Sequence, residues 1–188
     1  MINKLLQYDK DLFLLINDSG IEFLDPFWVF ISSTFSAIPI FLWLIFLCIK
    51  KLGNSFWIGI LLICTVVGLA DFISVHFFKN IFMRLRPCHD PELIDQIRLL
   101  VSKGGAYGFV SSHAANYFAL AAISSILFSE RSRFIYIIYS WAFLVAFSRV
   151  FVGKHYPLDV VCGALLGIII AKYIWVLLLK TKAKNLFI

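Results

Sequence analysis

The chain has 188 residues, of which 61% are hydrophobic and 15% are charged, and its net charge at pH 7 is +6. A soluble domain of this length has too little interior to bury so much apolar surface, so the composition excludes an ordinary soluble protein and predicts one solvated largely by lipid. The length suits one bundle of a few spans, which we take as a single domain over residues 1–188. The positive charge fits the flanks of membrane spans, so we expect no nucleic-acid partner.

The first segment, residues 2–17, predicts an amphipathic helix that lies in the membrane interface and does not cross the bilayer. Its leucines, isoleucines and phenylalanine are interspersed with Lys and Asp, and the run Asn17-Asp18-Ser19-Gly20 is typical of a helix end. The alternative is a sixth span that joins Leu12 to the residues after it. Three acidic residues, Asp18, Glu22 and Asp25, make that alternative costly.

Five later segments predict membrane-spanning helices, because a span needs about 20 mainly apolar residues. They cover approximately residues 27–49, 56–78, 109–128, 134–147 and 158–179. The expected fold class is therefore all-α, a polytopic membrane helical bundle of about five spans plus the N-terminal interfacial helix. We expect the longest polar segment, residues 84–108, to be a loop with one short helix near residues 91–100.

The charges of the loops predict how the bundle is oriented. One side of the membrane receives positive residues between and after the spans: Lys50, Lys51, Arg131, Arg133 and the Lys-rich tail. The other side receives the N-terminus and the loops at residues 79–107 and 149–155. Because short cytoplasmic loops carry an excess of Lys and Arg, we expect the first side to be cytoplasmic. The second side would then face the exterior.

Three polar clusters interrupt the apolar chain, each at the end of a long apolar run and all on that second side. They contain Lys79 and Arg86; Ser111, Ser112 and His113; and Ser148, Arg149, His155 and Asp159. Together they supply three cations, three hydroxyls, two imidazoles and a carboxylate. Cations, hydroxyls and helix N-termini are the groups that bind phosphate. We therefore interpret the three clusters as one phosphate site, which in a membrane protein indicates a phosphorylated lipid.

The third cluster predicts a nucleophile. His155 and Asp159 are four residues apart, one helical turn, so their side chains can meet. A carboxylate that accepts the proton of one ring nitrogen leaves the other nitrogen free to attack. Pro157 fits a helix start between them. Arg149, six residues upstream of His155, can hold a phosphoryl group with its planar guanidinium.

The other two clusters add an anion site and a proton donor. Ser111 and Ser112 occupy the positions where a helix begins, and free backbone amides there attract anions. His113 can donate a proton to a leaving oxygen, and Lys79 and Arg86 add positive charge. Taken singly, each group has a simpler interpretation, such as a snorkelling cation, a helix cap or a structural pair. Their joint location on one membrane face favours the phosphate site.

The spacing of these residues resembles a known family. Lys79-x6-Arg86-Pro87, Ser111-Ser112-His113 and Ser148-Arg149-x5-His155-x3-Asp159 resemble the three-part signature of the type 2 phosphatidic acid phosphatases, which are related to the soluble vanadium haloperoxidases. The family pattern for the second part is Pro-Ser-Gly-His, and this chain has Val110 and Ser112 at the Pro and Gly positions. The side chain of Ser112 thus replaces a hydrogen beside the bound phosphate.

The resemblance implies dephosphorylation through a phosphohistidine, with no metal and no cofactor. His155 would be the nucleophile, Asp159 its orienting partner and His113 the general acid. The phosphate would be bound by Lys79, Arg86, Ser111, Ser112 and Arg149. The four cysteines agree with a site without metal, because they show no CxxC or Cys/His ligand spacing.

The leading hypothesis is an integral lipid phosphatase of the bacterial inner membrane that acts on undecaprenyl pyrophosphate and has its site on the periplasmic or exterior face. The alternatives within the family are lipid A, phosphatidylglycerophosphate and phosphatidic acid. An anion transporter is the alternative from another class. It would place charges along a pore or in repeats, whereas here they cluster at one end.

Overall fold

The computed structural model describes residues 2–129 and 132–187. Within these residues the regular structure is helical, apart from one isolated bridge between Leu85 and Tyr107. The α-helices are α1 (Ile2–Asp18), α2 (Asp25–Ser32), α3 (Ile38–Leu52), α4 (Phe56–Ile73), α5 (Asn80–Phe82), α6 (Ser112–Leu127), α7 (Ser132–Phe151) and α8 (Pro157–Leu179). A π-helical segment, Ser74–Lys79, joins α4 to α5, and short 3-10 turns occur at Glu22–Leu24, Thr34–Ala37, Gly53–Ser55, Pro87–His89 and Lys182–Leu186. The expected all-α bundle is confirmed.

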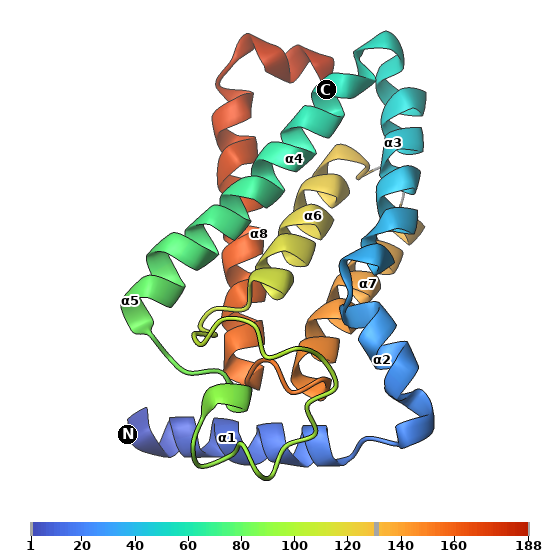
Figure 1. Ribbon diagram of the computed structural model, residues 1–188. Coiled ribbons are helices and arrows are strands. Elements are labelled where there is room, and N and C mark those ends of the chain that lie inside the picture. Colours follow the sequence, from blue (N-terminus) through green and yellow to red (C-terminus); the bar gives the residue numbers. More distant parts are fainter. Residues whose placement is uncertain (1, 130–131, 188) are drawn as a thin grey trace.

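The long helices lie side by side, and α1 lies across one end of them (Figure 1). Three described runs are long and apolar enough to cross a membrane: Thr34–Phe82, Arg133–Phe151 and Pro157–Leu179. The first run turns back at Gly53–Ser55, so α3 and α4 are two separate helices that run in opposite directions (Figure 1). Helix α6 has only 16 residues, roughly 24 Å, and packs among α4, α7 and α8. The number of spans therefore stays a prediction.

The predicted span over residues 27–49 is not one helix. Ser33 is extended, with φ −82° and ψ 158°, and separates α2 from the turn that precedes α3. The Ser36 hydroxyl donates to the carbonyl oxygens of Ile31, at 2.9 Å, and Ser33, at 2.8 Å, so the break is satisfied by hydrogen bonds inside the protein. Pro39, in the first turn of α3, suits a helix start.

The prediction of a short helix near residues 91–100 is wrong. Residues 91–96 form turns, and residues 97–100 have no regular structure. The buried Asn17 side chain explains this, since it exchanges two hydrogen bonds with the backbone of Arg98, at 2.7 and 3.0 Å. A backbone that is bonded to α1 in this way is not available for helical hydrogen bonds. The loop therefore packs along α1.

The closest packing in the bundle is between α6 and α8. A Cβ atom on Gly163 would lie 2.5 Å from the carbonyl oxygen of Ser111, and one on Gly167 would lie 2.1 Å from that of Ala115. We call Gly163 and Gly167 the glycine seam. Small residues four positions apart let two membrane helices approach until their backbones touch. The seam also places the beginning of α6 against the beginning of α8, where the Ser111 amide donates to the Asp159 carbonyl at 2.9 Å.

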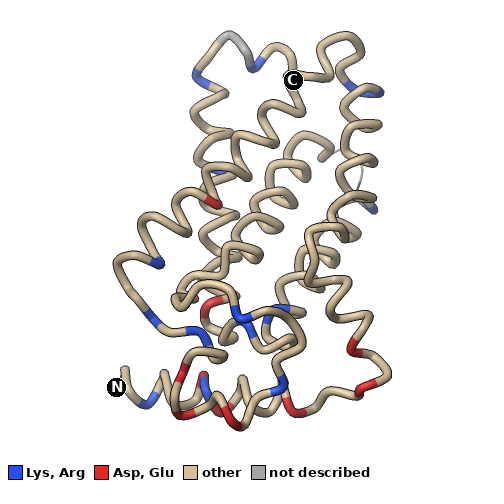
Figure 2. Tube along the Cα trace, viewed as in Figure 1, with Lys and Arg blue, Asp and Glu red and all other residues tan. Residues whose placement is uncertain are grey.

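The two ends of the bundle differ in charge. Acidic residues gather at the end where α1 lies, together with Lys and Arg, as Figure 2 shows. At the other end, Lys50 and Lys51 close α3 and Lys180 follows α8. Of the positive residues expected there, Arg131 lies outside the described residues, as does its neighbour Glu130.

Candidate active site

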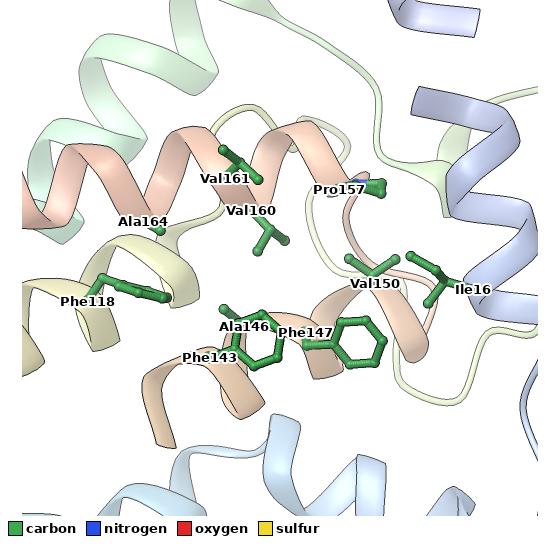
Figure 3. A pocket seen from close by; sticks show the side chains of 10 residues that line it. All are labelled: Ile16, Phe118, Phe143, Ala146, Phe147, Val150, Pro157, Val160, Val161 and Ala164. Atoms are coloured by element: carbon green, nitrogen blue, oxygen red, sulfur yellow. The ribbon is translucent and has the colours of Figure 1, made fainter. Parts of the chain in front are cut away.

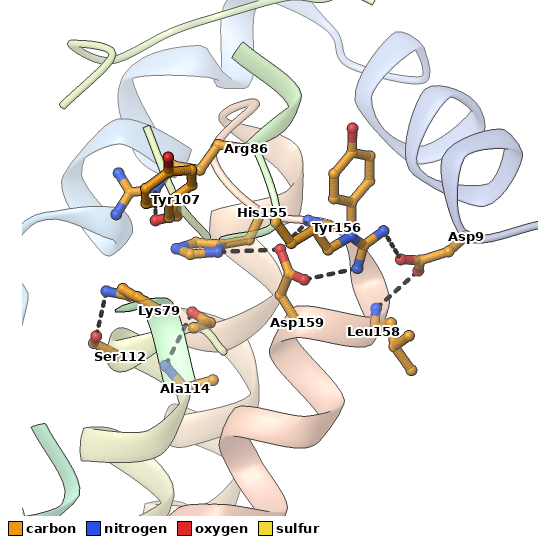
Figure 4. Close-up of polar contacts among 12 residues, drawn as sticks. Asp9, Lys79, Arg86, Tyr107, Ser112, Ala114, His155, Tyr156, Leu158 and Asp159 are labelled. Carbon is orange, nitrogen blue, oxygen red and sulfur yellow. Dashed lines mark hydrogen bonds and ion pairs between the residues drawn. The ribbon is translucent and has the colours of Figure 1, made fainter. Parts of the chain in front are cut away.

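The structure brings the three polar clusters together at the end of the bundle that α1 covers (Figures 1 and 4). Six elements contribute: the π-helical segment with Lys79, the loop after α5 with Arg86, the first turn of α6 with Ser111, Ser112 and His113, the last turn of α7 with Arg149, the loop before α8 with His155, and the first turn of α8 with Asp159.

His155 and Asp159 face each other at the start of α8. Nδ1 of His155 lies 3.4 Å from Oδ2 of Asp159, longer than a typical hydrogen bond, and both side chains are buried. The Tyr156 amide donates to the same Oδ2 at 3.1 Å, and Pro157 occupies the first turn of the helix. The other ring nitrogen points away from Asp159, toward the side of Lys79 and Arg86 (Figure 4). Catalytic contacts in unliganded sites are often long and shorten when substrate binds.

Three cations surround this ring nitrogen, and each is anchored by protein oxygens. Lys79 Nζ donates to Ser112 Oγ at 2.6 Å, and Arg86 Nε donates to the Tyr107 carbonyl at 3.1 Å. Arg149 Nη1 donates to the Ser32 carbonyl at 2.9 Å and also contacts the Ser32 hydroxyl. Nε of Arg149 is buried and has no partner among the described residues. A buried N–H donor without a partner can donate to a bound anion.

The N-terminus of α6 is built by its serines. Ser111 caps the helix, because its hydroxyl accepts from the Ala114 amide at 3.4 Å, and it is fully buried. The hydroxyl of Ser112, the residue that departs from the family pattern, holds Lys79 and shares a 2.7 Å hydrogen bond with Ser74. His113 follows, close enough to Arg149, His155, Lys79 and Arg86 to interact with their charges.

The electrostatics of the site favour an anion. Burial, followed by the charges of Arg149 and Arg86, holds the pKa of His155 well below its usual value of 6.5. Burial and the charge of Arg86 lower the pKa of Lys154 to about 8. Burial also lowers the pKa of Arg86. All three pKa values are shifted in the direction expected where positive charges are buried close together. Burying like charges costs free energy, and a bound anion would offset that cost.

Sequence reasoning missed two residues that shape the site from its loop. Lys154 is buried, and its Nζ donates to the Ser102 carbonyl at 2.7 Å and to that of Lys103, so it holds the loop over the site. A Cβ atom on Gly108 would lie 2.9 Å from Arg86 Cγ and 3.2 Å from Asp159 Oδ2, so a side chain at this position would displace Arg86. Two features of the sequence could have indicated these residues. Lys154 directly precedes His155, and Gly108 lies shortly before Ser111.

It also missed two residues on the other side of Asp159. Arg84 Nη1 donates to Asp159 Oδ1 at 2.8 Å, and Arg84 Nη2 donates to Oδ2 of Asp9, in α1, at 2.7 Å. Arg84 lies between Lys79 and Arg86 in the sequence but had no assigned role, and Asp9 lies in the helix expected in the membrane interface. Only the tertiary structure relates them.

A separate cavity of about 180 Å³ lies between α6, α7 and α8, with Ile16 of α1 at one end (Figure 3). Its walls are formed by apolar residues alone: Ile16, Phe118, Phe143, Ala146, Phe147, Val150, Pro157, Val160, Val161 and Ala164. It offers no charged group to an anion, so the candidate anion site is the cluster that contains Lys79, Arg86 and Arg149. Among the described residues, no group of three or more His, Cys, Asp or Glu side chains is arranged to hold a metal ion.

Comparison with known proteins decides the family. Residues 59–183 match the model of the PAP2 superfamily, which covers more than half of the chain and all three polar clusters. The chain belongs to the PAP2 superfamily. The family resemblance drawn from the three motifs is thereby confirmed, and this PAP2 protein is a membrane lipid phosphatase, a hydrolase of phosphoric esters.

Individual relatives are similar over most of their length. The chain is 32% identical over 184 residues to a lipid A 4'-phosphatase of Porphyromonas gingivalis, covering 96% of this chain and 77% of that protein. It is 34% identical over 164 residues to an undecaprenyl-diphosphatase of Sulfolobus acidocaldarius, covering 85% of this chain and 73% of that protein. Among solved structures, a transmembrane PAP2-type phosphatidylglycerolphosphate phosphatase of Bacillus subtilis superposes with a TM-score of 0.71 at 18% identity, covering 96% of this chain and 89% of that one. This last likeness concerns the fold.

Proposed function

We propose that this PAP2 protein removes a phosphate from lipid A, as its relative in P. gingivalis is named for doing. The observation that carries the proposal is the extent of that similarity, 96% of the chain at 32% identity, against 85% for the undecaprenyl-diphosphatase. Undecaprenyl pyrophosphate, the leading substrate in the sequence hypothesis, therefore becomes the second candidate. It is kept because the identity to that relative, 34%, is no lower.

The proposed chemistry needs no metal and centres on His155 and Asp159, which Figure 4 shows, together with His113. The free ring nitrogen of His155 attacks phosphorus, while Asp159 holds the ring and stabilises its positive charge. The bond between phosphorus and the lipid oxygen breaks, and His113 donates a proton to that oxygen. Water then attacks the phosphohistidine and gives its proton to His113, which the first step left unprotonated, and inorganic phosphate and free His155 are released.

The anchored cations support this proposal. Phosphoryl transfer depends mainly on positioning and on neutralising charge at the phosphoryl oxygens. Lys79, Arg86 and Arg149 are fixed by protein oxygens before substrate arrives, so little reorganisation is needed. The unpaired Nε of Arg149 gains a partner when phosphate binds.

We also propose that the site faces the exterior of a bacterial inner membrane. The end opposite the site carries Lys50, Lys51 and Lys180, next to ends of apolar helices. Positive residues at the ends of spans favour the cytoplasmic side.

The test is a phosphate-release panel with purified protein in detergent and EDTA. It compares lipid A, undecaprenyl pyrophosphate, phosphatidylglycerophosphate and phosphatidic acid, with His155→Ala as the matched inactive variant. We expect the highest kcat/KM for lipid A and no release above background from His155→Ala. A preference for another lipid contradicts the substrate proposal. Turnover by His155→Ala, or activity that requires added magnesium, contradicts the mechanism.

A further inference from the structure

The carboxylate of Asp159 is bound from the side that faces away from His155. Its Oδ2 is directed at the imidazole and at the Tyr156 amide, whereas its Oδ1 accepts from Arg84 at 2.8 Å. Asp159 is fully buried, so neighbouring protein groups determine the orientation of its carboxylate. The direction in which this carboxylate points therefore depends on Arg84.

Arg84 is in turn held in place by α1. Its second terminal nitrogen donates to Asp9 Oδ2 at 2.7 Å, and its guanidinium lies over the Tyr156 ring, 4.1 Å from the centroid. Planar guanidinium groups use their fork of donors to bind two acceptors at fixed angles. Arg84 thus bridges two carboxylates, one in α1 and one in α8, and Figure 4 shows the continuous row of contacts from Asp9 to His155.

Asp9 is fixed as well. Its Oδ1 accepts from the Leu158 amide at 2.8 Å, at the N-terminus of α8, where a negative charge is favourable. Its side chain is only 6% exposed, and that of Arg84 is 18% exposed. Asp9, Arg84 and Asp159 are therefore each held by at least two contacts.

We propose that Arg84 is a positioning residue, which with Asp9 of α1 orients Asp159 and, through it, the His155 imidazole. The inference rests on the proposed role of His155 as nucleophile. It assigns α1 a part in catalysis, because the outermost member of the row belongs to that helix. Neither Arg84 nor Asp9 touches the phosphoryl group.

The experiment compares Arg84→Ala and Arg84→Lys with the wild type, in steady-state phosphate release from the panel lipid that the wild type hydrolyses fastest. For Arg84→Ala we expect kcat to fall roughly 10- to 100-fold, the loss typical when an outer partner of a functional imidazole is removed. KM should stay within about a factor of two, because the phosphate-binding cations remain. Arg84→Lys should recover part of kcat, and methylguanidinium should restore activity to Arg84→Ala.

Asp9→Asn should lower kcat less than Arg84→Ala does, since Arg84 would still be attracted to Asp159. Asp11→Asn is its matched control. Asp11 lies on the exposed side of the same helix, and its side chain bonds to Gln7. We expect Asp11→Asn to leave kcat unchanged.

Arg98→Ala is the control for a loss of fold. It removes a similar arginine–aspartate pair, Arg98 with Asp25, away from Asp159. We expect it to lower thermal stability without lowering kcat. An equal fall of kcat in Arg98→Ala and Arg84→Ala, or no rescue by methylguanidinium, overturns the positioning role. An inactive His155→Ala beside a fully active Arg84→Ala overturns this inference alone, whereas an active His155→Ala overturns the proposed function.

Discussion

At the scale of single residues, the site concentrates positive charge around one histidine. His155 is buried and is close to Arg149, Arg86, Lys79 and Lys154, all of which oppose its protonation. Its pKa lies well below 6.5, so the neutral ring that can attack phosphorus persists into acid solution. The folded protein also binds fewer protons here than the unfolded chain does. The free energy of unfolding should therefore decrease as the pH falls below 6.5.

This predicts the acid limb of the activity profile. We expect the acid limb of kcat/KM, which reports the protonation of free His155, to be centred below pH 6.5, because the pKa of His155 lies well below that value. Replacing Lys154 by Met removes one of the four positive charges and should move the acid limb to higher pH. A limb centred at 6.5 or above in the wild type would contradict the electrostatic account of the site.

At the scale of helices, the glycine seam determines the distance between the two halves of the site. The residues on α6 and the pair at the start of α8 are related through the contact of Gly163 and Gly167 with backbone carbonyls. An added methyl group has no room there, so the helices must move apart. His113 and His155 would then separate.

We expect Gly167→Ala to lower the free energy of unfolding by roughly 1–3 kcal/mol, the usual cost of overpacking, and to reduce activity. Gly68→Ala is the matched control in α4, since a Cβ atom there meets nothing within 4 Å. That change should stabilise the protein by roughly 0.5–1 kcal/mol, because alanine restricts the unfolded chain. Thermal unfolding in detergent measures both. Equal stability of the two variants would show that the seam is not tightly packed.

At the scale of the whole molecule, we expect the unequal distribution of charge to orient the protein in the membrane. Lys103 lies in the exposed loop at the site end, and Lys50 is exposed at the other end. In a background with the four native cysteines replaced by alanine, we expect Lys103→Cys to react with a membrane-impermeant maleimide in intact spheroplasts. Lys50→Cys should react only after lysis. The reverse pattern would place the site in the cytoplasm.

Much of this architecture was predictable because its signals are local. Apolar runs gave the positions of α4, α6, α7 and α8, and the spacing of His155 and Asp159 anticipated that they face each other. The break in the helix predicted over residues 27–49 was missed. Hydrogen bonds of Ser36 inside the protein satisfy that break, and apolar content does not reveal them. Arg84 and Asp9 were missed for a different reason: they are 75 residues apart in the chain, and nothing in either segment specifies the other.

The contact between Asp9 and the Leu158 amide has a consequence for biosynthesis. The two residues are separated by 149 positions, so α1 meets this partner only after all the residues between them have been translated. At 5–20 residues per second, that interval is roughly 7–30 s. During this time the exposed side chains of Leu5, Leu12 and Leu15 can hold α1 on the membrane surface. A nascent chain that ends before α8 therefore lacks both Asp159 and the partner of Asp9, and its site is incomplete.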